Sequence, residues 1–173
     1  MLLSLLSPES YVEVCRHKKC TWVHHVDTVS ALALFHDGAL LFSASWDHTF
    51  KCLQSVADAH HDAVNTILVS TDGTTYTGSA DTTVKVWRRL PGETKHSLVG
   101  TLERHRSAVN TLALSSNGSV LYSVACDRSF VVWEGGGGGS SGDGSSSTPM
   151  VVAGVLSGHT KAVLCLETVG ELV

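Results

Sequence analysis

The sequence predicts an all-β protein built from repeated four-stranded antiparallel sheets, and two observations carry this prediction. A short turn at an aspartate, followed by a run that ends on tryptophan, occurs at residues 81–87 and again at residues 127–133. Around these motifs lie short apolar runs rich in β-branched residues, which are typical of buried strands. Because one such sheet has two faces to bury, several copies are expected to stack around an axis.

The repeats align without adjustment on four valines that lie inside apolar runs. A histidine stands four residues before each valine, and a glycine stands nine residues after each of the first three. Each glycine follows an aspartate or an asparagine, and such dipeptides supply the positive backbone angles of a tight hairpin. The valines are Val29, Val64, Val109 and Val163, the histidines are His25, His60, His105 and His159, and the glycines are Gly38, Gly73 and Gly118.

This alignment predicts the order of strands within a repeat. Two strands flank the hairpin glycine, a third ends at the tryptophan, and a further apolar run supplies the fourth. In the second repeat the strands are expected at 64–69, at 75–79, up to residue 87 and at 97–102. In the third repeat they are expected at 109–114, at 119–125, up to residue 133 and at 150–156. Each unit is therefore predicted to be an antiparallel meander.

The motifs resemble those of WD-repeat proteins, whose four-stranded sheets, called blades, form β-propellers. His60 precedes Asp81 by 21 residues, and the equivalent histidine precedes Asp127 by 22 residues. The segments 11–14, 16–19 and 22–30 are similar to plant WD-repeat proteins of the JINGUBANG-like group. The resemblance implies a partial β-propeller of about three blades, one of them defective. The ring is not expected to be closed by this chain alone, because a closed ring needs at least four blades.

The resemblance also implies a buried relay in each blade. In the family, the aspartate orients the histidine ring, the histidine reaches a Ser or Thr hydroxyl, and that hydroxyl meets the tryptophan N–H. The residues two before each aspartate are Ser45, Ser79 and Ala125, whereas those four before are Ser43, Thr77 and Ser123, and only the second series always carries a hydroxyl. Because the set recurs, we assign it a structural role and not that of a hydrolase triad. The predicted relay residues are His60, Thr77, Asp81, Trp87, His105, Ser123, Asp127, Trp133, His25, Ser43 and Asp47.

The first blade departs from the pattern. Six residues after Asp47 comes Leu53, where the tryptophan belongs, and Leu53 also stands seven residues before His60, the place of the fourth strand. The segment around Leu53 thus fits both the third and the fourth strand of the pattern. We expect this blade to have three strands and no indole, which leaves His25 and Ser43 without their usual partner.

These expectations divide the chain into a disordered N-terminus at residues 1–10 and a partial propeller at residues 11–173. The propeller is predicted to contain an outer strand at 11–15, the defective blade at 28–56 and full blades at 63–102 and 108–156. Residues 135–148, rich in Gly and Ser, are expected to form a flexible loop inside the last of these blades. An incomplete blade is expected at 162–173.

Composition narrows the classes of partner. The formal net charge of -4 argues against a nucleic-acid surface, which is normally basic. The apolar run 1–6 is too short for a signal peptide or a membrane span, so no membrane partner is predicted. Five cysteines without a regular framework favour reduced thiols and an intracellular location, in the cytoplasm, the nucleus or both. No cofactor and no metal site are predicted.

The resemblance implies a non-catalytic scaffold that binds protein partners, whose identity is unknown, through loops held by a rigid frame. The chain is expected to be a fragment of a longer plant regulatory protein. If the short chain is real, its open blades could self-associate. The candidate partner contacts in the turns near the relay are Trp46, His48, His61, Asp62, Arg106 and Arg128.

Two alternative hypotheses belong to other classes. The first is an enzyme, with zinc held by Cys15, Cys20 and neighbouring histidines, or a hydrolase that uses one repeat's His and Asp. The spacing of these cysteines matches no common zinc finger. The second alternative is a truncated gene product with no independent function.

Overall fold

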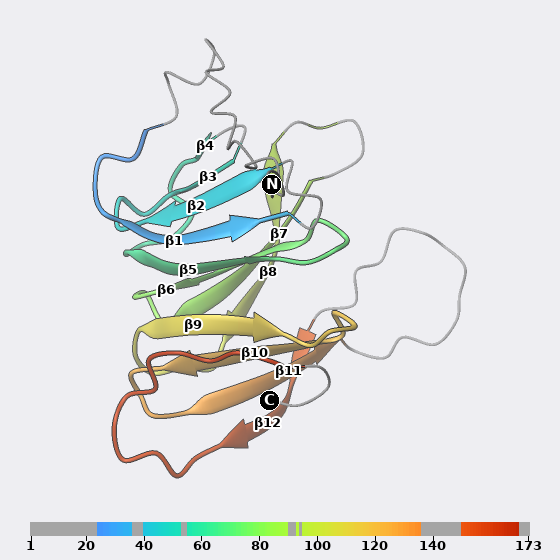
Figure 1. Cartoon of the computed structure of the whole chain (residues 1–173). Coiled ribbons are helices and arrows are strands. Elements are labelled where there is room, and N and C mark those ends of the chain that lie inside the picture. Colours follow the sequence, from blue (N-terminus) through green and yellow to red (C-terminus); the bar gives the residue numbers. More distant parts are fainter. Residues whose placement is uncertain are drawn as a thin grey trace, which may run out of the picture.

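The computed structural model describes residues 24–35, 40–52, 55–89, 93, 95–135 and 150–169. Within these ranges the regular secondary structure consists of strands, which form three separate four-stranded sheets. Figure 1 shows the three sheets stacked one beneath another, from the blue N-terminal sheet to the red C-terminal one. The prediction of an all-β, antiparallel and unclosed architecture is confirmed. In the part of the chain that the structure describes, no helix has the length and hydropathy needed to cross a membrane.

Each sheet is a meander in which consecutive strands pair antiparallel. The first sheet contains β1 (Val29–Leu34), β2 (Leu41–Ser45), β3 (Phe50–Lys51) and β4 (Ser55–Val56). The second contains β5 (Val64–Val69), β6 (Thr75–Ser79), β7 (Thr83–Arg89) and β8 (His96–Glu103). The third contains β9 (Val109–Leu114), β10 (Val120–Ala125), β11 (Phe130–Gly135) and β12 (Met150–Leu156).

The first strand of every sheet carries a β-bulge directly after the valine on which the repeats align. The register of the pairing shifts between Val29 and Ala31 in β1, and at the equivalent places in β5 and β9. A bulge leaves one residue out of the ladder and turns its side chain aside. In each case that side chain donates a hydrogen bond to the next valine's carbonyl: Ser30 to Val64, Asn65 to Val109 at 3.0 Å, and Asn110 to Val163 at 2.7 Å.

The apolar core lies between neighbouring sheets. One cluster joins Phe42, Ala44 and Phe50 of the first sheet to residues of the second sheet that include Trp87. A second cluster joins the second sheet to the third, where Trp133 is buried. Since each sheet is stabilised by burying a face against its neighbour, a single sheet would expose most of its apolar surface.

The two outward faces of the stack remain exposed and apolar. On the first sheet, Leu32 and Leu34 each have 64% of their surface exposed, and Leu41 is also exposed. On the opposite side of the stack, Val151, Val155 and other apolar residues of β12 are exposed. In a closed ring such faces lie against further blades, and their exposure agrees with an open stack of three.

The first blade differs from its prediction, because it has four strands and not three. β3 and β4 are each two residues long, and they pair through Phe50 with Val56 and Lys51 with Ser55. The segment between Asp47 and His60 is shorter than its equivalent between Asp81 and His105. It therefore forms a shorter outer hairpin and still keeps both strands, since two antiparallel residue pairs suffice to turn the chain back. Leu53 itself lies outside the described residues.

The C-terminal segment also differs from its prediction as the start of a further blade. Residues 157–168 form no strand, and Val169 makes only an isolated bridge. The segment nevertheless lies along β9, because Asn110 bonds the Val163 carbonyl and Thr168 donates to the Leu114 carbonyl at 2.8 Å. Both bonds are donated by side chains, so they hold the segment beside β9 without forming a backbone ladder.

Four predicted segments lie wholly or partly outside the residues that the structure describes. Gly135, expected as the first residue of the Gly/Ser loop, belongs to β11 and pairs with Met150. The remainder of that loop lies outside the described residues. The same holds for the N-terminus at 1–10, for the outer strand at 11–15, and for residues 170–173 of the incomplete blade.

Gly78 permits the close approach of the second and third sheets, and replacing it with alanine is expected to destabilise the protein. A Cβ atom at this position would lie 2.7 Å from Val109 Cγ1 and 2.8 Å from Thr66 Cγ2. Both neighbours are branched and buried, so the overpacking should lower the free energy of unfolding by about 1–3 kcal/mol. Urea denaturation of Gly78→Ala measures this change.

Gly154→Ala is the matched control, because a Cβ atom at that strand position would have no heavy atom within 4 Å. We expect the control to be neutral or stabilising by up to about 1 kcal/mol. Equal unfolding free energies for the two variants would contradict the proposed close packing at Gly78.

Candidate structural relay and exposed turns

In the second sheet the structure brings the four predicted relay residues into one hydrogen-bonded chain. His60 Nδ1 lies 2.9 Å from Asp81 Oδ2, and His60 Nε2 lies 2.8 Å from Thr77 Oγ1. The Trp87 indole N–H donates to the same hydroxyl oxygen at 2.8 Å. The chain thus connects the turn before β5, the middle of β6 and the end of β7.

The third sheet repeats this arrangement. His105 Nε2 lies 2.7 Å from Ser123 Oγ, and the Trp133 indole donates to that oxygen at 2.8 Å. On the other side of the ring, His105 Nδ1 lies 2.9 Å from Ser129 Oγ and 3.3 Å from Asp127 Oδ2. The equivalent hydroxyls of Thr83 and Thr49 lie 3.3 Å from the histidine Nδ1 in the other two sheets, so the hydroxyl is nearer than the aspartate only in the third sheet.

The first sheet holds a shortened version. His25 Nδ1 lies 2.9 Å from Asp47 Oδ2, and His25 Nε2 lies 2.8 Å from Ser43 Oγ. Among the described residues no indole donates to Ser43, in agreement with the tryptophan that is lacking after Asp47 in the sequence. His25 and Ser43 therefore bond each other but lack the last link of the chain.

Each hydrogen-bond donor of the full relay has an acceptor when the histidine is neutral. The Trp87 indole can only donate, so Thr77 Oγ1 accepts from it and donates its own proton to His60 Nε2. The remaining ring proton, on Nδ1, is then donated to Asp81. Protonating Nε2 would place two donors against one buried hydroxyl. Burial lowers the pKa of both His60 and His105 below the ordinary value of 6.5, against the opposing attraction of the partner aspartate.

The aspartates of the relay accept several hydrogen bonds. For Asp81 burial acts to raise the pKa, but bonds from the Thr83 hydroxyl and from backbone N–H groups lower it to about 2. Burial acts in the same direction on Asp127, and bonds led by the Ser129 hydroxyl lower the pKa of Asp127 to about 2. The pKa of Asp47 is likewise lowered by hydrogen bonds, led by that from Thr49, in opposition to burial.

Sequence reasoning missed these additional donors. A hydroxyl residue stands two positions after every relay aspartate, and its side chain donates to that carboxylate at 2.5 to 2.7 Å. The recurrence is visible in the sequence and was the signal that could have found them. The residues are Thr49, Thr83 and Ser129.

The serines that stand two residues before the aspartate, Ser45 and Ser79, make different hydrogen bonds. Ser79 Oγ donates to the Asp62 carbonyl at 3.2 Å and accepts from the Asp81 N–H at 3.0 Å, and Ser45 makes the equivalent bonds in the first sheet. These hydroxyls join two turns and do not contact the histidine ring. The residue four before the aspartate is therefore the one that bonds the histidine in all three sheets.

The relay contains the residue types of a hydrolase triad, but its hydroxyl groups are not accessible to a substrate. Thr77 and Ser123 have no exposed surface, and each hydroxyl already accepts from an indole N–H. A nucleophile must reach a substrate carbonyl, which a fully buried hydroxyl cannot do. The geometry therefore favours a structural role for the relay.

The six predicted partner contacts are all exposed. They lie at the end of each sheet where the first strand begins and the second strand ends, on the left in Figure 1. Trp46 has half of its surface exposed, an unusual state for so large an apolar ring. The other five exposed residues are His48, His61, Asp62, Arg106 and Arg128.

The relay aspartates hold the backbone of these turns. Asp81 Oδ2 accepts the His61 N–H at 3.0 Å, and Asp127 Oδ2 accepts the Arg106 N–H at 2.7 Å. A cavity of about 170 Å³ lies beside the latter contact, and its lining includes Arg104, Arg106 and Ser129. The same carboxylates thus stabilise the buried relay and position exposed side chains above it. Arg104 was not predicted as a contact.

The tips of the turns have an uncommon backbone conformation. The residue after each relay aspartate has a positive φ: 67° at His48, 74° at Thr82 and 70° at Arg128. None of these residues is glycine, and this left-handed region is sparsely populated by other residue types. The hydrogen bonds around each aspartate over-determine the turn and hold it in this conformation.

The zinc hypothesis finds no support in the described part of the chain. Among those residues no group of three or more His, Cys, Asp or Glu side chains is arranged to hold a metal ion. Cys15 and Cys20 lie outside the described residues.

Comparisons with known proteins agree with this geometry. A family model described as WD domain, G-beta repeat, matches residues 17–52, 50–88 and 96–134. A probable cytosolic iron-sulfur protein assembly protein 1 from Malassezia globosa is 32% identical over 95 residues, covering 49% of this chain and 27% of the relative. The protein of the same name from Mycosarcoma maydis is 31% identical over 110 residues, covering 64% of this chain and 23% of the relative.

Two solved structures share the fold. A structure of U3-55K and one of the RRP9 WD40 repeats each align with a TM-score of 0.69 over 86% of this chain, at 22% and 23% identity. The chain covers 45% and 44% of those two structures. It spans about a quarter of the length of the curated relatives given above.

Replacing Thr77 with valine is expected to lower the free energy of unfolding by about 2–5 kcal/mol. The substitution keeps the shape of the side chain but leaves the Trp87 N–H and His60 Nε2 without a partner, and each buried unpaired group costs about 1–3 kcal/mol. Chemical denaturation at neutral pH measures the change.

Thr75→Val is the matched control in the same strand. Thr75 and Thr77 both have no exposed surface, but the Thr75 hydroxyl has no hydrogen-bond partner among the described residues. The same substitution is therefore expected to stabilise the protein by about 1 kcal/mol. If both valine variants lost the same stability, the relay bonds would not be the cause.

The stability is also expected to fall as the pH is lowered through 6.5. Since burial keeps the pKa of His60 and His105 below that value in the folded state, the unfolded state binds more protons in this window. The aspartates contribute in a separate window, from their ordinary value of 3.8 down to about 2. Urea midpoints at about pH 7.5 and pH 5.5 isolate the histidine contribution.

The double variant His60→Gln with His105→Gln should show a smaller drop in midpoint between those two pH values. His61→Gln, which changes an exposed neighbouring histidine, should retain the full drop. An unchanged drop in the double variant would assign the pH dependence to other groups.

Proposed function

Because the chain belongs to the WD domain, G-beta repeat family, we propose that it is a non-catalytic scaffold that binds protein partners through the exposed turns above its relays. One observation supports this proposal most strongly. All six predicted contacts are exposed at the same end of the three sheets, and the relay aspartates fix the backbone of the turns that carry them. Exposed side chains on a rigid frame are a common basis of recognition.

The side chains of these turns suggest the chemistry of the partner. The exposed ring of Trp46 lies in the first sheet, and large aromatic side chains supply much of the binding energy at protein interfaces. On the third sheet, Arg104, Arg106 and Arg128 are all exposed. We therefore propose a partner segment that presents an apolar residue to the first sheet and acidic residues to the third.

We also propose a location and an origin for the chain, and similarity to other proteins supports both. The name of the two fungal relatives includes the word cytosolic, and we propose that this chain works inside the cell, in the cytoplasm, the nucleus or both. We also propose that it forms part of a longer regulatory protein similar to the plant JINGUBANG-like group. The similarity of segments 11–14, 16–19 and 22–30 supports the plant group, and the apolar faces of the stack support a longer ring.

A charge-reversal variant tests the scaffold proposal. Affinity purification from the source cells, followed by quantitative mass spectrometry, would compare the wild type with Arg106→Glu/Arg128→Glu. We expect at least one stoichiometric partner to be lost from the variant, because two cations at the predicted contact surface become anions. The mass of the purified native protein, compared with 18.3 kDa for this chain, tests whether it is part of a longer protein.

The control variant, Arg89→Glu/Lys95→Glu, makes the same change of charge at the end of the second sheet that lies away from the relay. Arg89 is the last residue of β7, Lys95 directly precedes β8, and both residues are exposed. It should keep every partner, and all three proteins should melt at the same temperature. Retention of every partner by both variants would exclude the turns above the relay as the binding surface. A native mass near that of the short chain, with no partner bound, would favour the truncated product that the sequence left as an alternative.

A further inference from the structure

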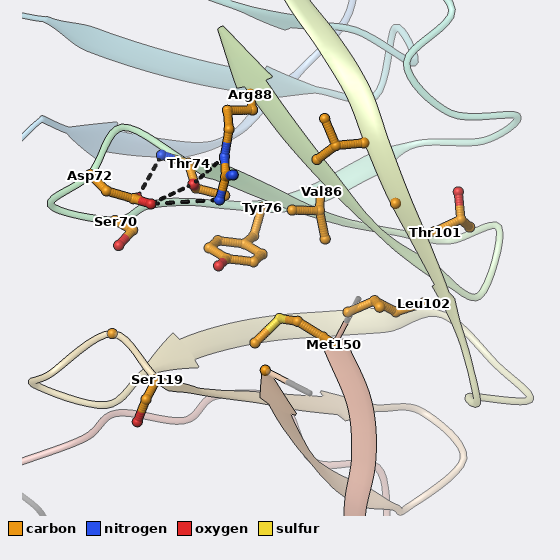
Figure 2. Close-up of a pocket in the computed structure, with 14 residues that line it drawn as sticks. Ser70, Asp72, Thr74, Tyr76, Val86, Arg88, Thr101, Leu102, Ser119 and Met150 are labelled. Atoms are coloured by element: carbon orange, nitrogen blue, oxygen red, sulfur yellow. Dashed lines mark hydrogen bonds and ion pairs between the residues drawn. The ribbon is translucent and has the colours of Figure 1, made fainter. Parts of the chain in front are cut away.

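A cavity of about 500 Å³ lies between the second and third sheets, away from the relay turns. The hairpin turns β5–β6 and β9–β10 form part of its lining, together with β7, β8 and the first residue of β12 (Figure 2). Its volume falls within the range of about 300–1,000 Å³ that is typical of ligand sites. The cavity thus has the size of a binding site at a place to which the scaffold proposal assigns no role.

Tyr76 projects its hydroxyl group into this cavity. The residue is only 7% exposed, and its ring belongs to the apolar cluster between the sheets. Figure 2 shows the ring pointing from β6 into the space above Ser119 and Met150. No described residue forms a hydrogen bond with this hydroxyl. Burial, with a further contribution from Asp72, raises the pKa of Tyr76, so the group remains a neutral donor. Among the described residues Thr75 Oγ1, and not the Tyr76 hydroxyl, is the fully buried polar atom without a partner. The Tyr76 hydroxyl therefore meets the open space of the cavity, where it can donate to a ligand.

A fixed polar network forms one wall of the cavity. Thr74 donates to Asp72 from both its N–H and its hydroxyl, each at 2.9 Å. Arg88 Nε donates to the Thr74 hydroxyl oxygen at 3.2 Å, and Arg88 Nη2 lies 3.7 Å from Asp72 Oδ2. This network orients the guanidinium, whose five N–H donors exceed the bonds it makes here. Arg88 can therefore donate to a ligand in the cavity.

Three apolar side chains complete the lining. Val86 lies beside Tyr76 on the same sheet, Leu102 belongs to β8, and Figure 2 shows the Met150 side chain facing the tyrosine across the gap. An unbranched thioether adapts readily to the shape of a neighbouring group. The cavity therefore combines a donor-rich end with an adaptable apolar wall.

Equivalent positions of the repeats carry different residues at the two boundaries between neighbouring sheets. Tyr76 occupies the place of Phe42 in the first sheet, five residues before the relay aspartate, and Met150 occupies the place of His96 in the pairing with the third strand. At the boundary between the first and second sheets, the rings of Phe42 and His96 are in edge contact, with centroids 5.7 Å apart. At the second boundary the equivalent side chains both line the cavity.

We propose that this cavity binds an apolar group that carries a hydrogen-bond-accepting oxygen at one end. Tyr76 and Arg88 donate to the oxygen, while Val86, Leu102 and Met150 contact the apolar body. Two sources present this chemistry: a free aromatic carboxylic acid, or an aromatic side chain next to a peptide carbonyl. The proposal goes beyond the scaffold function and is independent of it, because none of the six predicted contact residues lines the cavity.

The chain contains only two methionines, which makes the site directly observable. With methyl-¹³C methionine in the full chain, Met150 reports on the cavity and Met1 serves as an internal reference. The probes are hydrocinnamate, for the free acid, and N-acetylphenylalaninamide, for the peptide source. Each is added up to about 10 mM, above the dissociation constant of about 1 mM expected for probes of this size. We expect a saturable shift of the Met150 signal with at least one probe and a constant Met1 signal. The probe that binds more tightly identifies the source.

Tyr76→Phe should weaken the binding about threefold or more, because it removes one donor and keeps the ring. Tyr122→Phe, at the equivalent position of the third sheet, should bind as the wild type does. Gly100→Leu keeps the Met150 reporter and fills the lining where a Cβ atom would have only Val86 within 4 Å, at 3.8 Å, so binding should disappear. No Met150 shift with either probe, or the same affinity in wild type and Tyr76→Phe, would overturn the proposal. These outcomes do not depend on whether the relay turns bind a partner.

Discussion

The rest of the structure depends on the buried hydrogen-bond chain from aspartate through histidine and hydroxyl to indole. In the second sheet it joins His60, Thr77, Asp81 and Trp87, which come from two different strands and two different turns. Every donor in this chain has an acceptor only when the histidine ring is neutral. Burial of the ring favours the same neutral form. The chain aligns the strands of a sheet at one end and leaves apolar side chains to fill the space between sheets. Where the indole is lacking, in the first sheet, the outer hairpin is reduced to two residue pairs.

Contacts between sheets extend this order from one blade to the next. The bulged residues Ser30, Asn65 and Asn110 each donate to the carbonyl of the following aligned valine. The third of these bonds holds the C-terminal segment against β9 even though that segment forms no strand. The apolar faces of β1 and β12 have no such neighbour among the described residues, so they remain exposed at the two sides of the open stack.

The two ends of the sheets differ in what they expose. At the relay end, the carboxylates of Asp81 and Asp127 accept backbone N–H groups from the turns that carry His61 and Arg106. Recognition there would use side chains that are positioned by the core itself, with little conformational freedom left to lose on binding. At the hairpin end, the sheets separate around Tyr76 and leave a cavity with both polar and apolar walls. One repeated scaffold thus offers a surface and a cavity that are chemically different.

The sequence by itself determined the strand order of the second and third sheets and the members of the relay, because the spacings of His, Gly, Asp and Trp recur and are local. It also distinguished Thr77 from Ser79, since only one of the two hydroxyl positions is always filled. It did not identify the role of Thr49, Thr83 and Ser129, although their recurrence was visible. Only the tertiary structure decided that the first sheet keeps four strands, that residues 157–168 form none, and that Tyr76 faces a cavity. These outcomes depend on which backbone and side chains lie opposite each segment, and that is set by packing between sheets and not by the local spacing of residues.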